Sequence, residues 1–179
     1  MKVNMEQYRK SPRAQFLSYD EGEFFITICT LRKKHYFGEI ENGEMILSDV
    51  GIYLKEQLER CKELFSNLII PVYVIMPNHL HFIVSINELG KNKYNAQRSP
   101  NPVLRPNPTC RRHVPTLSKY ISSLKGTVTK YAWSKGYEFG WQSRYHDHLI
   151  RGLKDLNNIS DYIVNNVARW KSDCFNLKY

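Results

Sequence analysis

Val72–Ile86, with the sequence VYVIMPNHLHFIVSI, predicts two neighbouring strands joined by a tight turn. The first five residues are β-branched, aromatic or otherwise apolar, which is typical of a buried strand, and the Pro-Asn pair that follows is a turn signal. The second strand should run from His79 to about Ile86. Because successive side chains of a strand alternate between its two faces, His79 and His81 should project from the same face, roughly 7 Å apart.

These two histidines have two interpretations. Two imidazoles on one face of an otherwise apolar strand indicate the start of a metal site. They are equally compatible with half-buried histidines that hydrogen-bond to their neighbours. The metal interpretation therefore depends on further ligands elsewhere in the chain.

The composition indicates one globular domain, residues 1–179, with a basic surface. A chain of this length can bury a core without disulfides or metals. It has 26 Lys and Arg against 17 Asp and Glu, a formal net charge of +9. That excess suggests a polyanionic partner, nucleic acid ahead of a membrane surface, although a basic surface that only keeps the protein in solution is the alternative.

The cysteines and the hydrophobic pattern predict a cytoplasmic protein. The four cysteines (Cys29, Cys61, Cys110 and Cys174) are far apart and form no CxxC pair, as expected for reduced thiols. The N-terminal residues 1–15 lack the apolar core of a signal peptide. No apolar run reaches the ~18 residues of a membrane span, so we expect no membrane partner.

The remaining chain predicts an alternation of strands and helices. Several antiparallel strands with two or three helices are typical of an α+β sandwich in which a central antiparallel sheet is covered on one face. Ser48 or Asp49 is a candidate N-cap for one helix, and Thr116 for another. We expect a strand at 24–30, a hairpin turning at 41–44, helices at 49–64 and from 116 to about 136, a strand at 141–151 and a helix starting near 154.

A basic, proline-rich loop is predicted at about 88–115. This segment holds five of the eight prolines and six Lys or Arg residues against a single acid, Glu88. Such a composition does not favour a packed core and is typical of a long loop. An inert insertion and a flap that contacts phosphates both remain open.

A second group of candidate site residues lies in the last predicted helix. Tyr162 and Asn166 are four residues apart, so their side chains should share one helical face. If that helix packs across the histidine face of the sheet, His79, His81 and the carboxamide oxygen of Asn166 could bind one divalent cation. Tyr162 would then direct its hydroxyl at whatever the metal polarises, although a core tyrosine on an amphipathic helix is the alternative.

Three ordered motifs extend this pattern over about residues 20–170. They are His79-Leu80-His81 within MPNHLHFIV, then Trp141-Gln142 followed by Asp147–Arg151, and finally Tyr162 with Asn166 four residues later. In this order and spacing the chain resembles the HUH-type single-tyrosine transposases, in particular their REP-associated tyrosine transposase branch. The branch commonly has proline after the asparagine, where this chain has Val167. That departure could let the helix run further and leaves Asn165 open as the ligand, although the spacing from Tyr162 favours Asn166.

The resemblance implies a ferredoxin-like α+β fold and an enzyme that nicks and rejoins single-stranded DNA carrying a hairpin. Tyr162 would attack a backbone phosphate to give a 5′-phosphotyrosine and a free 3′-OH, and a second 3′-OH would reverse the step. The metal, held by His79, His81 and Asn166, would be Mg²⁺ or Mn²⁺. Imidazole ligands suit Mn²⁺ better, and only the resemblance puts Mg²⁺ first.

Binding of DNA should use the basic surface, with aromatic side chains stacking on unpaired bases. Lys119, Lys125 and Lys130, on one predicted helix, are equally compatible with a solvated face. His146 and His148 could support the metal ligands, orient DNA or be structural. The candidate DNA contacts are Arg13, Lys33, Lys34, Lys125, Lys130, Arg144, His148 and Arg151.

Other classes of function remain open. A non-catalytic, domesticated nucleic-acid-binding module would keep the sheet and the basic surface without turnover. A protein in which the histidines hold a structural or regulatory zinc is a third class. Relatives include monomers and homodimers that exchange the tyrosine helix, so the oligomeric state is open, and the resemblance implies a bacterial protein that acts at the nucleoid.

Overall fold

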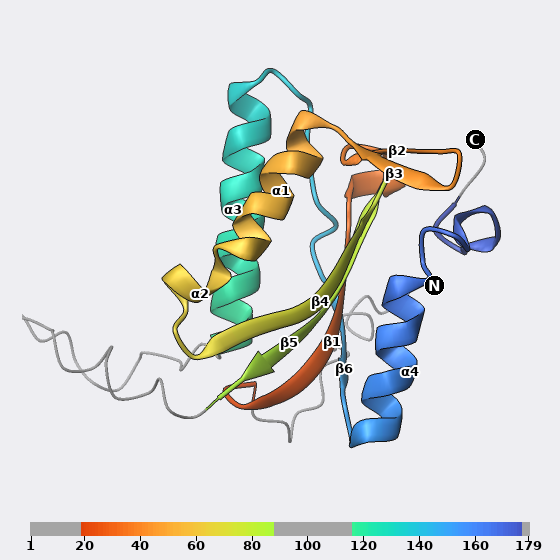
Figure 1. Ribbon diagram of the computed structural model, residues 1–179. Coiled ribbons are helices and arrows are strands. Elements are labelled where there is room, and N and C mark those ends of the chain that lie inside the picture. Colours follow the sequence, from red (N-terminus) through yellow and green to blue (C-terminus); the bar gives the residue numbers. More distant parts are fainter. Residues whose placement is uncertain (1–18, 88–115, 177–179) are drawn as a thin grey trace, which may run out of the picture.

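The computed structural model describes residues 19–87 and 116–176 as an antiparallel sheet between two layers of helices (Figure 1). The main sheet has four strands in the order β4-β5-β1-β6, and every neighbouring pair is antiparallel. A hairpin of β2 (Gly38–Glu41) and β3 (Glu44–Leu47) is separate from it. The main strands are β1 (Gly22–Cys29), β4 (Leu68–Met76), β5 (His79–Ile86) and β6 (His146–Leu149).

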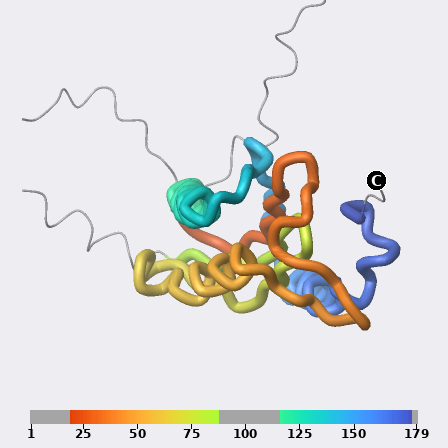
Figure 2. Tube along the Cα trace, turned by 90° about the horizontal axis from the view of Figure 1, so that it is seen from above, coloured from red at the N-terminus to blue at the C-terminus, as the bar shows by residue number. Residues whose placement is uncertain are grey.

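The helices lie on both faces of this sheet. Between the strands come α1 (Asp49–Glu59), α2 (Cys61–Leu64) and α3 (Thr116–Ser134), and after β6 comes α4 (Leu153–Val164). Figure 2, seen from above, shows α4 and the C-terminal segment on the side of the molecule away from α3. Without the hairpin and α4 the order is β-α-β-β-α-β, which is the ferredoxin-like arrangement. The predicted α+β ferredoxin-like sandwich is confirmed.

The expectation that only one face of the sheet is covered is wrong. On β5, Leu80, Phe82 and Val84 pack into the main core with α1 and α3. Ile83 faces the other way and packs against Ile163 of α4 in a second, smaller core. The strand is apolar on both faces because both are buried, which explains why its sequence is a nearly continuous apolar run interrupted by histidines.

Two of the predicted turn and cap signals are confirmed at atomic detail. Asn42 and Gly43, between β2 and β3, both have positive φ, 52° and 85°, as a two-residue hairpin turn of the right twist requires. Ser48 is the N-cap of α1, because its hydroxyl oxygen accepts a hydrogen bond from the Gly51 amide at 3.1 Å.

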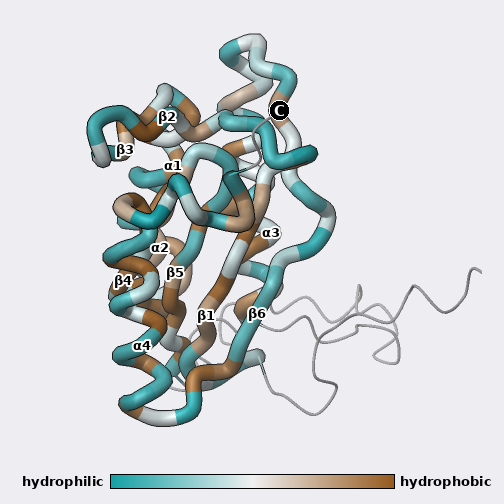
Figure 3. The backbone as a smooth tube through the Cα atoms, turned by 90° about the vertical axis from the view of Figure 1, so that its right-hand side faces the viewer, coloured by the Kyte–Doolittle hydropathy of each residue, from teal (hydrophilic) through white to brown (hydrophobic). Residues whose placement is uncertain are grey.

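Two element boundaries differ from the prediction. The helix expected at 49–64 is interrupted at Arg60, where the backbone turns before the short α2. The strand expected at 141–151 is limited to β6, and before it Trp141 forms a single bridge with Thr30. Figure 3 shows that the chain before and along β6 is mostly hydrophilic, whereas β1 beside it is largely hydrophobic.

Several predictions lie outside the described residues. The basic loop at 88–115 and the candidate DNA contact Arg13 are among them, so the single-domain assignment over 1–179 also stays a prediction. Within 19–87 and 116–176, no helix combines the length and the apolar character needed to cross a lipid bilayer.

Candidate active site

The two histidines of β5 lie together under α4. Their ring centroids are 4.5 Å apart, and both side chains are buried. In the sheet, His79 is opposite Cys29 and His81 is opposite Thr27, both on β1. The predicted common face is therefore confirmed, and the imidazoles are held by strands on both sides.

Asn78 fixes the tautomer of His79. The Asn78 amide nitrogen donates to two backbone carbonyls, those of Lys33 at 3.1 Å and Phe175 at 2.9 Å, so its oxygen must face His79. That oxygen lies 2.8 Å from His79 Nδ1 and can only accept, which assigns the proton to Nδ1. His79 Nε2 then carries a lone pair, and it is buried without a hydrogen-bond partner among the described residues.

His81 is positioned in a similar way by Thr27 and Tyr162. Its Nδ1 lies 2.8 Å from the Thr27 hydroxyl, and its Nε2 lies 3.3 Å from the Tyr162 hydroxyl. If Nδ1 donates to Thr27, Nε2 accepts from Tyr162. A ring nitrogen that donates to a fixed neighbour is the usual way in which proteins orient a histidine ligand.

The end of α4 brings Asn166 into the site. The helix ends at Val164, so Val167 in place of a proline does not extend it, an outcome that the sequence left open. The backbone amide of Asn166 donates to the Ile163 carbonyl at 3.2 Å, which makes a turn tighter than that of an α-helix. Asn166 is 1% exposed there. Asn165 is instead exposed and donates to the Asp161 carbonyl at 2.8 Å, so Asn166 is the buried one of the two asparagines and the one that interacts with Tyr162.

The carboxamide of Asn166 has two separate roles in this arrangement. Its hydrogen bond with Tyr162 lowers the pKa of the phenol, because it favours the ionised form. Its Oδ1 is buried and has no partner in the described part of the chain. The site thus contains two buried polar atoms without partners, Asn166 Oδ1 and His79 Nε2.

The electrostatics of the site keep the imidazoles neutral and the phenol protonated. Burial lowers the pKa of His79 to about 2, with smaller contributions from His81 and Lys33. Burial lowers the pKa of His81 to about 4, with a smaller contribution from His146. Burial also raises the pKa of Tyr162 and outweighs the hydrogen bond from Asn166. Neutral imidazoles have the lone pairs that a metal needs, whereas a protonated phenol is a poor nucleophile without a cation or a base.

The C-terminal segment, residues 166–176, covers the histidine pair. The Phe175 ring lies 4.5 Å from that of His79, and the Trp170 ring lies 6.1 Å from it. Lys33 Nζ lies 4.8 Å from the centre of the Phe175 ring and donates to the Cys174 carbonyl at 3.2 Å. A basic side chain is therefore held beside the histidines by the segment that closes over them.

Lys33 belongs to a strained turn, Leu31–Lys33, that Asn78 holds in place. Arg32 and Lys33 have φ of 56° and 54°, the left-handed region that is unfavourable for side-chain-bearing residues. The Lys33 carbonyl is one of the two acceptors of Asn78. Sequence reasoning treated Asn78 only as a turn signal and missed this role, because both acceptors are distant in the chain.

The other predicted DNA contacts are dispersed. Lys34, Lys130, Arg144 and Arg151 are exposed, whereas Lys125 is partly buried and donates to the carbonyls of Gln142 at 2.8 Å and Arg144 at 3.3 Å. Burial lowers the pKa of Lys125 to about 8. Its contacts indicate a structural role that supports the chain before β6.

His148 does not join the histidine pair. Its Nε2 lies 3.0 Å from an Asp155 carboxylate oxygen on the exposed surface. Within residues 19–87 and 116–176, no cluster of three His, Cys, Asp or Glu side chains is placed to hold a metal, so the candidate ligand set is two imidazoles and one carboxamide.

Comparison with known proteins yields a family relative and a shared fold. No protein-family model matches the chain. An uncharacterized protein of Haemophilus influenzae is 36% identical over 168 residues, which cover 93% of this chain and 92% of that protein. A REP-associated tyrosine transposase, solved bound to a REP hairpin, matches with a TM-score of 0.57 and 17% identity over 89% of this chain and 73% of its own. A structure from Deinococcus radiodurans is more distant, with a TM-score of 0.46 and 14% identity over 87% of this chain and 97% of its own.

Proposed function

Because the chain belongs to one family with the Haemophilus influenzae protein and has the fold of a REP-associated tyrosine transposase, we propose that it nicks and rejoins single-stranded DNA through Tyr162. The observation that carries the proposal is the group formed by His79, His81 and Asn166. It presents two buried polar atoms without partners in the described chain, beside a phenol within hydrogen-bond distance of His81.

The donor set fits a divalent cation. A buried polar atom that lacks a partner destabilises a fold by about 1–3 kcal/mol, and His79 Nε2 and Asn166 Oδ1 both lie in one site. One nitrogen from each imidazole and one amide oxygen suit Mn²⁺ well and Mg²⁺ acceptably. Bound there, the cation would polarise a phosphodiester oxygen and stabilise the charge that develops during attack.

Tyr162 would be the nucleophile. The lone pair of His81 Nε2 can serve the Tyr162 hydroxyl or a cation but not both, so occupation of the ligand site would release the phenol from His81. The hydrogen bond with the Asn166 side chain favours the ionised form of Tyr162. The Tyr162 hydroxyl loses its proton to solvent as its oxygen forms a bond to phosphorus, the bond from phosphorus to O3′ breaks, and the departing 3′ oxygen takes up a proton. Attack by the 3′-OH of another strand reverses these bond changes and restores the tyrosine.

We further propose that the tyrosine acts in cis. Tyr162 lies against His81 of its own chain, and its ring packs edge-on to Phe25 at 6.1 Å. Every member of the proposed site therefore comes from one chain. Exchange of α4 between two protomers is not needed to complete it.

The proposed substrate is single-stranded DNA next to a hairpin. The transposase with the shared fold is bound to a REP hairpin, and this chain carries a net charge of +9. Lys33 lies at the histidine pair, where a phosphate would have to approach. Lys34, Arg144 and Arg151 are exposed and could contact the flanking backbone.

The direct test is an SDS-resistant adduct between the protein and labelled hairpin oligonucleotides in the presence of Mn²⁺ or Mg²⁺. Tyr162→Phe should abolish the adduct, whereas the control Tyr137→Phe, at a tyrosine that is 42% exposed, should keep it. Chelation of the cation should abolish it as well. An adduct that persists in Tyr162→Phe would refute the assignment of the nucleophile.

A non-catalytic DNA-binding module is the second candidate. The contact of Phe175 with His79 favours it, because a ring packed on the ligand limits access to the site. This alternative predicts hairpin binding that is unchanged in Tyr162→Phe and no adduct in the wild-type protein with any hairpin.

A further inference from the structure

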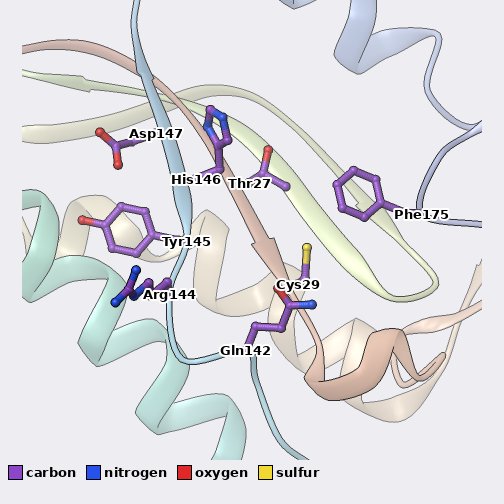
Figure 4. A pocket seen from close by; sticks show the side chains of 8 residues that line it. All are labelled: Thr27, Cys29, Gln142, Arg144, Tyr145, His146, Asp147 and Phe175. Carbon is purple, nitrogen blue, oxygen red and sulfur yellow. The ribbon is translucent and has the colours of Figure 1, made fainter. Parts of the chain in front are cut away.

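A pocket adjoins the histidine pair on the same side of the sheet, towards the β6 edge (Figure 4). Its volume is about 380 Å³, and its lining includes Thr27, Cys29, Gln142, His146 and Phe175. Small-molecule pockets span about 300–1,000 Å³, so this one has room for a single base with part of its sugar and not for a duplex. The proposed chemistry uses none of this space.

The sheet register connects the pocket to the histidines. Thr27 on β1 is paired with His81 on one side and with His146 of β6 on the other, so the three side chains share one row across the sheet. The Thr27 hydroxyl lies 2.8 Å from His81 Nδ1. Only the Thr27 side chain therefore separates a ligand in the pocket from His81, a proposed metal ligand. This separation suits the nucleotide next to the reacting phosphate.

Flat rings border the pocket on two sides. Figure 4 shows Phe175 across from His146, Thr27 and Cys29, whereas Tyr145 and Asp147 project to the opposite side of the strand. The Phe175 side chain lines the pocket and is only partly buried, while His146 is exposed. Single-stranded bases are commonly bound by stacking on such rings.

Gln142 provides the polar group that could recognise a base. Its backbone is fixed, because its amide donates to the Cys29 carbonyl at 2.9 Å and its carbonyl accepts from Lys125 Nζ at 2.8 Å. Its side-chain carboxamide lines the pocket and has no hydrogen-bond partner among the described residues. A carboxamide donates and accepts at adjacent atoms, which matches the edge of a nucleobase.

We propose that this pocket binds one unpaired nucleobase of the DNA strand beside the reacting phosphate, stacked on Phe175 and hydrogen-bonded by Gln142. The pocket would select the base at one position and so set the sequence preference of cleavage. This inference rests on the proposed function, since it takes single-stranded DNA as the substrate. It goes beyond that function by naming the residues that determine specificity.

The test begins with selection of DNA by the full-length Tyr162→Phe protein, which should bind without cutting. The probe is a pool of hairpin oligonucleotides with randomised single-stranded flanks. We expect a strong base preference at one flank position, and we expect Gln142→Ala to lose or change the preference at that position alone. The control Ser143→Ala, at the exposed neighbouring residue, should select the same bases as its parent. Lys34→Ala, at an exposed residue outside the pocket lining, should weaken binding to all sequences alike, as expected for a phosphate contact.

Stacking is measured separately with 2-aminopurine at the selected position. Its fluorescence should be quenched by the Tyr162→Phe protein and by the same protein with Phe175→Tyr, but not with Phe175→Ala. An abasic site there should weaken binding roughly 5- to 150-fold, the loss expected for one stacked base. Free deoxynucleoside monophosphates in excess should not displace the oligonucleotide; if they do, the pocket is a site for a soluble nucleotide and the inference is overturned.

The outcomes separate this inference from the proposed function. A covalent adduct with a base preference that Gln142→Ala does not change overturns the pocket assignment and leaves the nuclease intact. A Gln142-dependent preference with quenching but no adduct supports the pocket and overturns the nuclease. A pool from which no DNA is selected contradicts both.

Discussion

Asn78→Ala is the substitution whose effect follows most directly from the geometry. The Asn78 side chain is 1% exposed and makes three hydrogen bonds, to the carbonyls of Lys33 and Phe175 and from His79 Nδ1. Its removal leaves the buried Nδ1–H unsatisfied, at about 1–3 kcal/mol, while the two part-buried carbonyls can be hydrated, at about 0.5–1.5 kcal/mol each. The free energy of unfolding should therefore fall by roughly 2–6 kcal/mol, a large share of the roughly 5–15 kcal/mol of a typical domain.

The assay is urea unfolding in the presence of a chelator, with Asn165→Ala as the matched control. Asn165 is exposed and its side chain makes one hydrogen bond, to the Asp161 carbonyl, so its loss should change the free energy of unfolding by less than about 1 kcal/mol. Asn78→Ala should also weaken Mn²⁺ binding by roughly 10–100-fold, because His79 loses the partner that orients it. A free energy of unfolding within about 1 kcal/mol of that of Asn165→Ala, with unchanged Mn²⁺ affinity, would refute the reasoning.

The remaining predictions concern pH, packing and salt. The pKa values of His79 and His81, about 2 and about 4, lie below the ordinary 6.5, so the unfolded chain binds more protons and metal-free stability falls as pH drops below about 6.5. At about pH 5 the two histidines together should lower the free energy of unfolding by roughly 4 kcal/mol relative to neutral pH. A double His79→Gln, His81→Gln variant should lose much less stability over the same pH range. If the variant and the wild-type protein show the same dependence of stability on pH, the two histidines are not its source. Gly51→Ala should destabilise the protein by about 1–3 kcal/mol or more, because the added Cβ would lie 2.1 Å from the Phe37 carbonyl oxygen. Gly126→Ala in α3, where the added Cβ has no atom within 4 Å, should stabilise it by about 0.5–1 kcal/mol. Thermal unfolding measures both changes. The affinity for hairpin DNA should fall as salt rises, with a log–log slope of roughly 0.7 per phosphate contacted. Lys34→Ala should reduce that slope by roughly 0.7, the value for one phosphate contact. An affinity that does not change with salt would exclude the basic surface as the binding site.

The sequence predicts the features of this fold that depend on neighbouring residues. The alternation along Val72–Ile86 and its Pro-Asn turn are local signals, and they specify both strands and the common face of His79 and His81. The spacing of Tyr162 and Asn166 similarly brings both to one end of α4. Local patterns are most reliable where a strongly apolar or strongly periodic segment leaves few alternatives.

Features that depend on distant contacts are not readable from the sequence. Asn78 is tied to Lys33 and Phe175, which are 45 and 97 residues away, so nothing beside it in the chain signals its role. The short β6 follows from Lys125, which takes the carbonyls of Gln142 and Arg144 that an extended strand would have used. The end of α4 at Val164 lacks a proline or glycine signal and accompanies the burial of Asn166.

The coverage of the second sheet face is a further case. The apolar residues of α4 predict only that the helix packs on something. The surface on which α4 packs consists of Ile83 and the partly buried Val72 and Val74. It is available because the alternate residues of the same strands face the main core on the other side of the sheet. A helix that could have joined α1 and α3 is thereby placed over the histidines.

The central claim is that Tyr162 forms a covalent bond to DNA at a cation site made by His79, His81 and Asn166. Peptide mapping by mass spectrometry of protein incubated with hairpin DNA and Mn²⁺ tests it directly, since the chain contains twelve tyrosines that could carry the adduct. We expect a nucleotide linked through its 5′ phosphate to Tyr162, and no adduct on Tyr162 in Asn166→Ala. A nucleotide attached to another residue, or an adduct on Tyr162 that forms equally well with the chelator present, would contradict it.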